Sequence, residues 1–196
     1  MSYAIVGFGA IGQALARAFA RKNIPVTVAA RRGPEAIAPQ AKAIGPTVTA
    51  SSLEDALKAQ TVILAIPFSE IAGLASMTNW DGRTVVDPTN AIDFPDFTPA
   101  DLGGKFSSSI VQETLSGARV VKAFNTIPAS ILAQSPEEDG GRRVVFLSGD
   151  DPGARKAVSA LIDDLGFAPM DLGSLHDGAS QQCFHPLWAK NLILKG

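Results

Sequence analysis

Three glycines near the start of the chain constrain its fold more than any other feature. In "IVGFGAIGQALA" (5–16), Gly7, Gly9 and Gly12 follow an apolar run, and an amphipathic stretch starts among them. The Gly-x-Gly-x-x-Gly pattern alone is weak evidence, but here a predicted strand precedes it, a predicted helix opens inside it and another predicted strand follows. In that context Gly7 permits a tight turn, Gly9 lets the backbone approach a pyrophosphate, and Gly12 lets the helix pack closely on the strand. The alternative is a glycine-rich turn that holds no ligand.

Short apolar runs alternate with amphipathic stretches over the rest of the chain. "SSLE" (51–54) matches a capping box, and Asp151 with Pro152 predicts an N-cap and a first-turn proline. From the apolar periodicity we expect strands at 3–6, 26–30, 47–49, 61–66, 84–87, 119–124, 142–148 and 167–172, and helices at 11–19, 51–59, 69–76, 109–115, 152–165 and 185–195. This alternation implies a parallel sheet covered on both faces. The predicted fold class is α/β, a Rossmann-type doubly wound, mainly parallel sheet with a small C-terminal α/β extension.

The length and composition suit one domain. The chain has 196 residues and is 46% hydrophobic, which is enough to bury a sizeable core. We expect a single domain over residues 1–196, with a dinucleotide-binding core at 1–127 and a C-terminal extension at 128–196 that is not an independent domain. Residues 88–105 predict a long irregular loop, because three prolines and a glycine pair interrupt the pattern. Loops of this length tend to be functional or mobile.

The composition excludes several kinds of partner. A net charge of −2 and a pI near 5.7 predict neither a nucleic-acid binder nor a membrane-surface binder. There is no signal-peptide pattern and no apolar run of about 20 residues, so we expect no membrane association and a cytoplasmic location. Cys183 is the single cysteine, which suits a reducing compartment, and a half-buried helix position explains it more simply than a nucleophile does. His176 and His185 lack partners at ligand spacing, so we expect no metal site.

Two arginines stand where dinucleotide-binding folds usually carry an acid. In NAD-binding chains an Asp or Glu after the second strand accepts hydrogen bonds from the adenosine ribose. This sequence has no acid before Glu35 and places Arg31 and Arg32 just past the strand. Guanidinium groups match phosphate oxygens in charge and geometry. The sequence therefore predicts NADP(H) rather than NAD(H), with Arg31 on the 2′-phosphate and Arg32 on the adenine or in water; a solvated basic turn is the alternative.

Further ligand contacts are expected beyond the carboxyl ends of the parallel strands. Ala65, Ile66 and Pro67 follow one strand with small side chains and free carbonyl groups, and Asn90 and Asn125 offer amides that both donate and accept. Either asparagine can instead simply hold a turn. The acid that ends the strand at 84–87 is interpreted as structural, because acids often secure such loops.

Several segments resemble the NADP oxidoreductases, coenzyme F420-dependent, and their relatives, whose fold also serves as the reductase domain of six-transmembrane metalloreductases. These segments are "GFGAIGQALA" (7–16), "ARR" (30–32), "VILAIPF" (62–68), "VVDPTNAI" (85–92), "VVKAFNTI" (120–127), "FLSGDDPGARKAVSALIDDLGF" (146–167) and "HPLWAKNL" (185–192). The similarity covers nearly the whole chain, and its most specific parts are "KAFNT" and "GDDP".

The resemblance implies binding residues and a reaction. The pyrophosphate would lie on Gly7, Phe8, Gly9, Ala10, Ile11 and Gly12, and the nicotinamide half and a flat acceptor would be lined by Ala65, Ile66, Pro67, Phe68, Thr89, Ala123, Phe124, Asn125 and Thr126. The family transfers hydride directly between nicotinamide and coenzyme F420, or a flavin such as FMN or FAD, so positioning carries the catalysis and no catalytic acid or base is expected. His185 and Lys190 depart from the frequent glycine and arginine of the family, which leaves the acceptor open.

Other classes fit this sequence less well. The Tyr-x-x-x-Lys pair of short-chain dehydrogenases is missing, because Tyr3 is the single tyrosine, and β-hydroxyacid dehydrogenases need a larger helical second domain. A non-catalytic NADP(H)-binding sensor that regulates a partner would carry the same glycine loop and arginines, and it is the alternative to an enzyme. The apolar residues of the C-terminal segment, among them Phe184, Leu187 and Trp188, favour a homodimer through the predicted last helix. The other expected partner is a small-molecule hydride acceptor.

Overall fold

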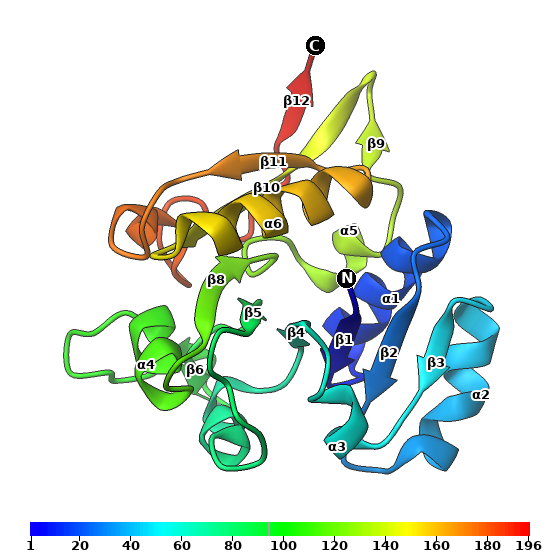
Figure 1. Cartoon of the computed structure of the whole chain (residues 1–196). Helices are drawn as coiled ribbons and strands as arrows, with labels where there is room; N and C mark the ends of the chain where they lie inside the picture. The colour runs from blue at the N-terminus through cyan, green and yellow to red at the C-terminus, as the bar shows by residue number, and fades with distance from the viewer. Residues whose placement is uncertain (94) are drawn as a thin grey trace.

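The protein is built on one long mixed sheet, seen in the computed structural model, which describes residues 1–93 and 95–196 (Figure 1). The strand order is β11-β10-β8-β5-β4-β1-β2-β3. The strands of this path are β1 (Tyr3–Val6), β2 (Val26–Ala29), β3 (Val48–Ala50), β4 (Thr61–Leu64), β5 (Thr84–Asp87), β8 (Arg119–Ala123), β10 (Gly141–Gly149) and β11 (Ala168–Asp171). All neighbours pair in parallel except β10 and β8, which are antiparallel. The predicted doubly wound, mainly parallel α/β fold is confirmed.

Helices cover both faces of the sheet, and the alternation of side chains along each strand assigns every residue to one face. The helices are α1 (Ala10–Arg21), α2 (Pro34–Ile44), α3 (Leu53–Ala56), α4 (Ser107–Thr114), α5 (Ala129–Leu132) and α6 (Pro152–Asp164), with the 3-10 helices η1 (Phe68–Leu74) and η2 (Asp177–Gln181). In β1, Ile5 belongs to the apolar core beneath α1 and α6, whereas Ala4 and Val6 belong to the core beneath α3, η1 and α4. This period of two is typical of strands buried on both faces.

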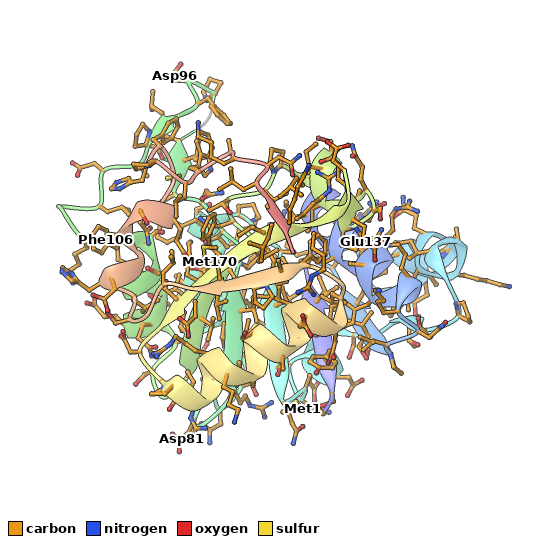
Figure 2. All side chains as sticks on the ribbon, turned by 90° about the horizontal axis from the view of Figure 1, so that it is seen from above. Met1, Asp81, Asp96, Phe106, Glu137 and Met170 are labelled. Carbon is orange, nitrogen blue, oxygen red and sulfur yellow. The ribbon has the colours of Figure 1, made fainter. Side chains whose placement is uncertain are left out.

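The predicted irregular loop at 88–105 contains a small element of its own. Strands β6 (Ile92–Asp93) and β7 (Thr98–Pro99) pair antiparallel and form a separate two-stranded sheet. Figure 2 shows Asp96 at the outer end of this loop, projecting from the body of the molecule. The loop therefore folds back on itself away from the main sheet.

The helix predicted at 185–195 is wrong. Residues 186–189 form turns, 190–192 have no regular structure, and β12 (Ile193–Lys195) pairs antiparallel with Gly141, Arg142 and Arg143 of β10. The two-residue strand β9 (Glu137–Glu138) pairs with the same end of β10. Backbone groups at this end of β10 need partners, and pairing with a segment distant in sequence supplies them. Apolar spacing within the last eleven residues carries no information about that long-range pairing.

Three other helices differ from expectation. The helix α2 was not predicted, because Pro34 and Pro39 interrupt its sequence and only Ile37 and Ala41 are buried. Pro34 nevertheless occupies the first helical turn, where its missing N–H costs nothing. The segment predicted as a helix at 69–76 is the 3-10 helix η1, and the short α5 was also not predicted.

A buried arginine connects β10 to the segments on either side. The Arg143 guanidinium donates to the Ser135 carbonyl oxygen at 2.8 Å, Gln134 Oε1 at 3.1 Å and Asn191 Oδ1 at 2.6 Å, and it lies 2.7 Å from Glu138 Oε2. Its side chain is 3% exposed. Each hydrogen bond to a charged donor of this kind contributes more to stability than a neutral one.

We expect Arg143→Ala to lower the free energy of unfolding by about 2–4 kcal/mol, because several hydrogen bonds to one buried charged donor are lost at once. Urea denaturation followed by circular dichroism measures the change. The neighbouring Arg142, whose side chain is 43% exposed and pairs with Asp163, is the matched control. We expect Arg142→Ala to cost under about 1 kcal/mol; similar losses for both variants would contradict the role of Arg143.

Candidate functional site

The loop between β1 and α1 leaves no room for side chains at two of its three glycines. Gly7 has a φ of 100°, and a Cβ there would lie 2.0 Å from the carbonyl oxygen of Ala65, which follows β4. A Cβ at Gly12 would lie 2.0 Å from the carbonyl oxygen of Gly7. Gly9 differs, because nothing in the described residues lies within 4 Å of the position its Cβ would take. Gly7 thus makes the tight turn, Gly12 allows the close packing of the helix, and Gly9 leaves an open surface.

The N-terminus of α1 offers free backbone donors next to Gly9. The first helical hydrogen bond runs from the Gln13 N–H to the Gly9 carbonyl oxygen at 2.9 Å, so the N–H groups of Ala10, Ile11 and Gly12 have no partner within the helix. The first turn holds no acid, and no side chain from the described part of the chain caps it. Such a helix end, with free donors and an uncompensated dipole, is suited to an anion.

A cleft of about 690 Å³ opens beside this loop. Its walls are residues that follow three adjacent strands: Gly7, Phe8 and Gly9 after β1, 30–32 after β2, and 65–70 after β4, with Phe68 not among them. In the strand order β1 lies between β4 and β2. After β1 the chain adds β2 and β3 on one side of it, and then crosses to add β4 on the other side. Ligands of open α/β sheets bind at this switch point. The structure therefore brings together the glycine loop, the two arginines and Ala65, Ile66 and Pro67.

One of the two arginines has an acidic partner inside the cleft. Arg31 Nη1 lies 3.1 Å from Glu70 Oε1, and the two side chains are 82% and 33% exposed. Arg32 is exposed and has no ion pair among the described residues. Sequence reasoning missed Glu70, which belongs to η1 and lines the cleft from the side opposite the arginines. The strand order β4-β1-β2 brings the segment after β4, which holds Glu70, close to the segment after β2, which holds Arg31.

The other predicted binding residues do not line the cleft. They are Ala10, Ile11, Gly12, Phe68, Thr89, Asn90, Ala123, Phe124 and Asn125. Ala123 and Phe124 are fully buried, and the ring of Phe124 packs edge-on against Phe167 at a centroid distance of 6.4 Å. Phe124 also has a φ of 64°. Any ligand contact by these two residues must therefore use their backbone, and their assignment stays a prediction.

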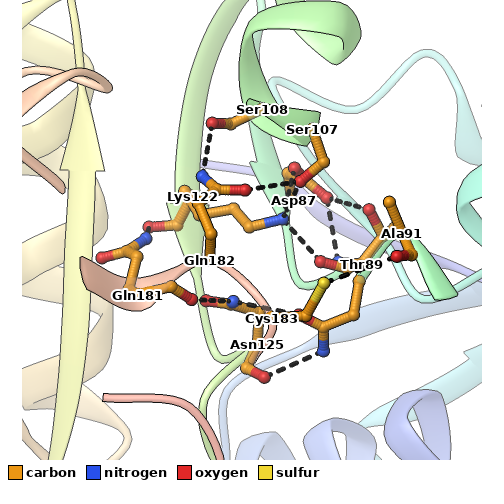
Figure 3. Close-up of polar contacts among 11 residues, drawn as sticks. Asp87, Thr89, Ala91, Ser107, Ser108, Lys122, Asn125, Gln181, Gln182 and Cys183 are labelled. Atoms are coloured by element: carbon orange, nitrogen blue, oxygen red, sulfur yellow. Dashed lines mark hydrogen bonds and ion pairs between the residues drawn. The ribbon is translucent and has the colours of Figure 1, made fainter. Parts of the chain in front are cut away.

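A buried polar network lies at the carboxyl ends of β5 and β8 (Figure 3). Lys122 Nζ is 3.0 Å from Asp87 Oδ2 and donates to the Thr89 carbonyl oxygen at 2.5 Å, and the side chains of Lys122 and Asp87 are both 0% exposed. Asp87 Oδ1 accepts from the Thr89 N–H at 2.9 Å and from its hydroxyl at 2.6 Å. The Lys122 ammonium thus links β8 to β5 and fixes the start of the loop after β5. The structural role expected for Asp87 agrees with this geometry.

The same network extends to Gln181, the last residue of η2, and to Gln182, which follows it. Gln181 Nε2 donates to the Lys122 carbonyl oxygen at 3.0 Å, and Ser107 Oγ donates to Gln182 Oε1 at 2.7 Å (Figure 3). Gln182 Nε2 in turn donates to Ser108 Oγ at 2.9 Å. Sequence analysis missed Lys122, although a lysine inside the apolar run "RVVKAF" is the visible signal. The partners on 107–108 and 181–182 carry no comparable signal.

Asn90 and Asn125 bond to each other across the loop ends. Asn90 Nδ2 donates to the Asn125 carbonyl oxygen at 3.0 Å, and Asn125 Nδ2 donates to Asn90 Oδ1 at 3.2 Å and to the Gln181 carbonyl oxygen at 2.6 Å. Asn125 is 4% exposed, and its Oδ1 has no partner in the described residues. Both asparagines therefore hold turns, and Asn125 in addition keeps a free acceptor.

Cys183 is half-buried, as expected, but lies in a turn rather than on a helix. Burial raises the pKa of its thiol, although nearby Lys122 acts in the opposite direction. The Sγ–H donates to the Ala91 carbonyl oxygen at 3.4 Å. A thiol with a raised pKa is a poor nucleophile. Among the described residues, no group of three or more His, Cys, Asp or Glu side chains could hold a metal ion.

The fold and the glycine loop are those of Rossmann-type oxidoreductases, and comparisons with known proteins narrow the class. The family "NADP oxidoreductase coenzyme F420-dependent" matches residues 2–91. A protein of Sinorhizobium meliloti, the hypothetical protein SMa0349, has a crystal structure that is 48% identical, with a TM-score of 0.96 over 100% of this chain and 96% of that one. A proposed F420 dependent NADP-reductase from Arthrobacter sp. FB24 is 29% identical, with a TM-score of 0.75 over 91% of this chain and 87% of that one.

One curated relative is a much larger protein. The metalloreductase STEAP3 of Rattus norvegicus is 31% identical over 124 residues, which are 62% of this chain and 24% of that protein. This chain thus spans about a quarter of that relative. None of the helices within residues 1–93 and 95–196 has the length and apolar character required to cross a bilayer. The chain is therefore similar to the NADP oxidoreductase, coenzyme F420-dependent family, and the match to the family itself lies within residues 2–91.

We expect Lys122→Met to lower the free energy of unfolding by about 3–5 kcal/mol, because Asp87 would remain as an unpaired buried charge. Urea unfolding of the purified variant measures the change. In the double variant Lys122→Met, Asp87→Asn no buried charge remains, so we expect part of the lost stability to return. A double variant no more stable than the single one would show that charge pairing is not what Lys122 contributes.

Proposed function

We propose that this chain binds NADP(H) in the cleft beside the glycine loop and transfers a hydride between the nicotinamide and a flat acceptor such as coenzyme F420 or a flavin. One observation carries the proposal: Gly9, with its open surface, lines the same cleft as the two exposed arginines, and the free N–H groups of α1 begin at the next residue. A pyrophosphate on the helix end and a 2′-phosphate beside Arg31 would use each of these features.

The nicotinamide end of the cofactor would reach the ends of β5 and β8. The orphaned Oδ1 of Asn125 is an acceptor that a carboxamide N–H can satisfy, and a buried acceptor without a partner is otherwise unfavourable. Thr89 is held by Asp87 and Lys122, and Asn90 is held by Asn125. We propose that these residues position the nicotinamide ring through their backbone and amide groups.

The chemistry proposed for the site requires orientation more than proton transfer. The cleft lining in the described residues contains no histidine, cysteine or lysine. Nicotinamide supplies a hydride at its C4 position when bound, and holding two flat rings face to face is the main task left to the protein. The likeness to a proposed F420 dependent NADP-reductase and to a metalloreductase favours a deazaflavin or flavin as the second ring.

We further propose that residues 1–196 act as one domain in a reducing cytoplasmic compartment, with 128–196 completing the sheet of the core. A homodimer remains part of the proposal, although its expected basis changes. Phe184 and Trp188 stack at 4.6 Å in turns rather than on a helix, and Phe184, Leu192 and Leu194 are 43%, 43% and 48% exposed. These apolar groups are the surface that a second copy would cover.

The direct test is turnover. Purified protein is mixed with NADPH and, in separate reactions, F420, FMN, FAD or a quinone, and the loss of reduced-nicotinamide absorbance is followed. We expect oxidation with at least one flat acceptor. Tight NADPH binding without turnover on any of them would favour the non-catalytic sensor instead.

We expect Arg31→Ala to weaken NADPH binding by about 1.5–3 kcal/mol, the contribution of a hydrogen bond to a charged group, and to leave NADH binding nearly unchanged. Calorimetric titration with both cofactors measures the two affinities. Arg32→Ala is the matched control, because the adjacent guanidinium is expected to stack on adenine or face water, and it should lose less. An equal loss of both cofactors in Arg31→Ala would refute the phosphate assignment.

A further inference from the structure

Glu70 is the only carboxylate among the described residues that line the cleft, and it faces the arginine proposed to bind phosphate. Its Oε1 lies 3.1 Å from Arg31 Nη1. Its own N–H donates to the Pro67 carbonyl oxygen at 2.9 Å, which fixes its backbone in the first turn of η1. The acid of this cleft thus comes from the segment after β4, whereas NAD-binding chains usually carry one after β2.

The sheet topology explains why this ion pair crosses the cleft. Arg31 follows β2, Glu70 is in the helix after β4, and β1 lies between these two strands. The two side chains therefore approach each other from opposite sides of the glycine loop that follows β1. In a switch-point site the adenosine half of a dinucleotide lies between these same two segments. A cofactor that enters the cleft must accordingly meet the Arg31–Glu70 pair.

We infer that Glu70 is a specificity-determining residue: it holds Arg31 across the cleft when no cofactor is bound and competes with the 2′-phosphate for the guanidinium. Glu70 therefore lowers the preference of the protein for NADP(H) over NAD(H). This inference rests on the proposed NADP(H) site and adds a residue that opposes it.

The physical basis is the different charge of the two carriers. Arg31 is 82% exposed, and an ion pair this exposed contributes little stability, so a phosphate dianion can displace the carboxylate. After displacement Glu70 remains a like charge close to the phosphate, which is unfavourable. NAD(H) presents a 2′-hydroxyl in the same place, which adds no charge and can donate to a carboxylate. Glu70 should therefore penalise only the phosphorylated carrier.

A supporting role for Glu70 would have the opposite sign. Arg31 carries five N–H donors, and one carboxylate leaves several of them free for a phosphate. If Glu70 mainly oriented the guanidinium, its removal would weaken NADP(H) binding. The direction of the change in affinity thus separates competition from support.

The experiment measures the dissociation constants of NADP⁺ and NAD⁺ by calorimetry for wild type, Glu70→Gln, Arg31→Ala and the double variant. We expect Glu70→Gln to bind NADP⁺ about threefold to tenfold more tightly, to leave NAD⁺ within about twofold, and to show a smaller gain at high salt. In the Arg31→Ala background the gain should shrink, because the competition is gone. Glu113→Gln, which removes an exposed acid of α4 that pairs with Lys105, is the matched control and should change neither constant.

The outcomes distinguish this inference from the proposed function. Arg31-dependent NADP⁺ binding that is unchanged or weaker in Glu70→Gln would overturn the competition while leaving the NADP(H) site intact. Wild-type protein that bound neither carrier would overturn the proposed function, and the inference with it. Unchanged thermal unfolding of Glu70→Gln, expected for an exposed pair, shows that the affinities compare folded proteins.

Discussion

Close backbone contact between the turn after β1 and the end of β4 is the constraint on which the candidate site depends. A side chain at Gly7 would overlap the carbonyl oxygen of Ala65, and one at Gly12 would overlap the carbonyl oxygen of Gly7. These two contacts fix the start of α1 against two neighbouring strands. The N-terminus of the helix, the open surface at Gly9 and the cleft wall after β4 therefore keep one arrangement, and larger residues at Gly7 or Gly12 would force them apart.

Two ion pairs of opposite character lie at the carboxyl-terminal edge of the sheet. Lys122 and Asp87 are enclosed in the protein, every contact of the ammonium is internal, and the pair secures the loops after β5 and β8. Arg31 and Glu70 meet in solvent across the cleft, where an ion pair is weak. Burial makes the first pair part of the framework, because breaking it strands a charge. Exposure makes the second pair weak enough for another anion to replace the carboxylate, which suits a candidate ligand-binding cleft.

The errors in the expected elements have particular physical causes. The last eleven residues have apolar spacing compatible with a helix, yet Ile193–Lys195 pair with β10, whose exposed backbone groups lie about fifty residues earlier in the chain. The helix at Pro34–Ile44 carries two prolines and buries little, so its pattern was too weak to detect. Glu70 and Lys122 are visible in the sequence as charged residues, but their roles were missed because their partners belong to other strands and loops.

Local patterns were sufficient for the order of the strands and most of the helices in the core, the glycine turn, the cap at Asp151 and the position of the arginines after β2. The capping box expected at 51–54 lies one residue further on, because the N-cap is Ser52 and its partner is Asp55. These features depend on residues that are close in sequence, where spacing and side-chain chemistry act directly. Only the tertiary structure decided that Glu70 faces Arg31, that Lys122 pairs with Asp87 beneath Thr89, and that the C-terminus adds a strand. Each of these contacts joins segments whose proximity follows from the strand order and the register of the sheet, and neither quantity is written in the spacing of residues along the chain.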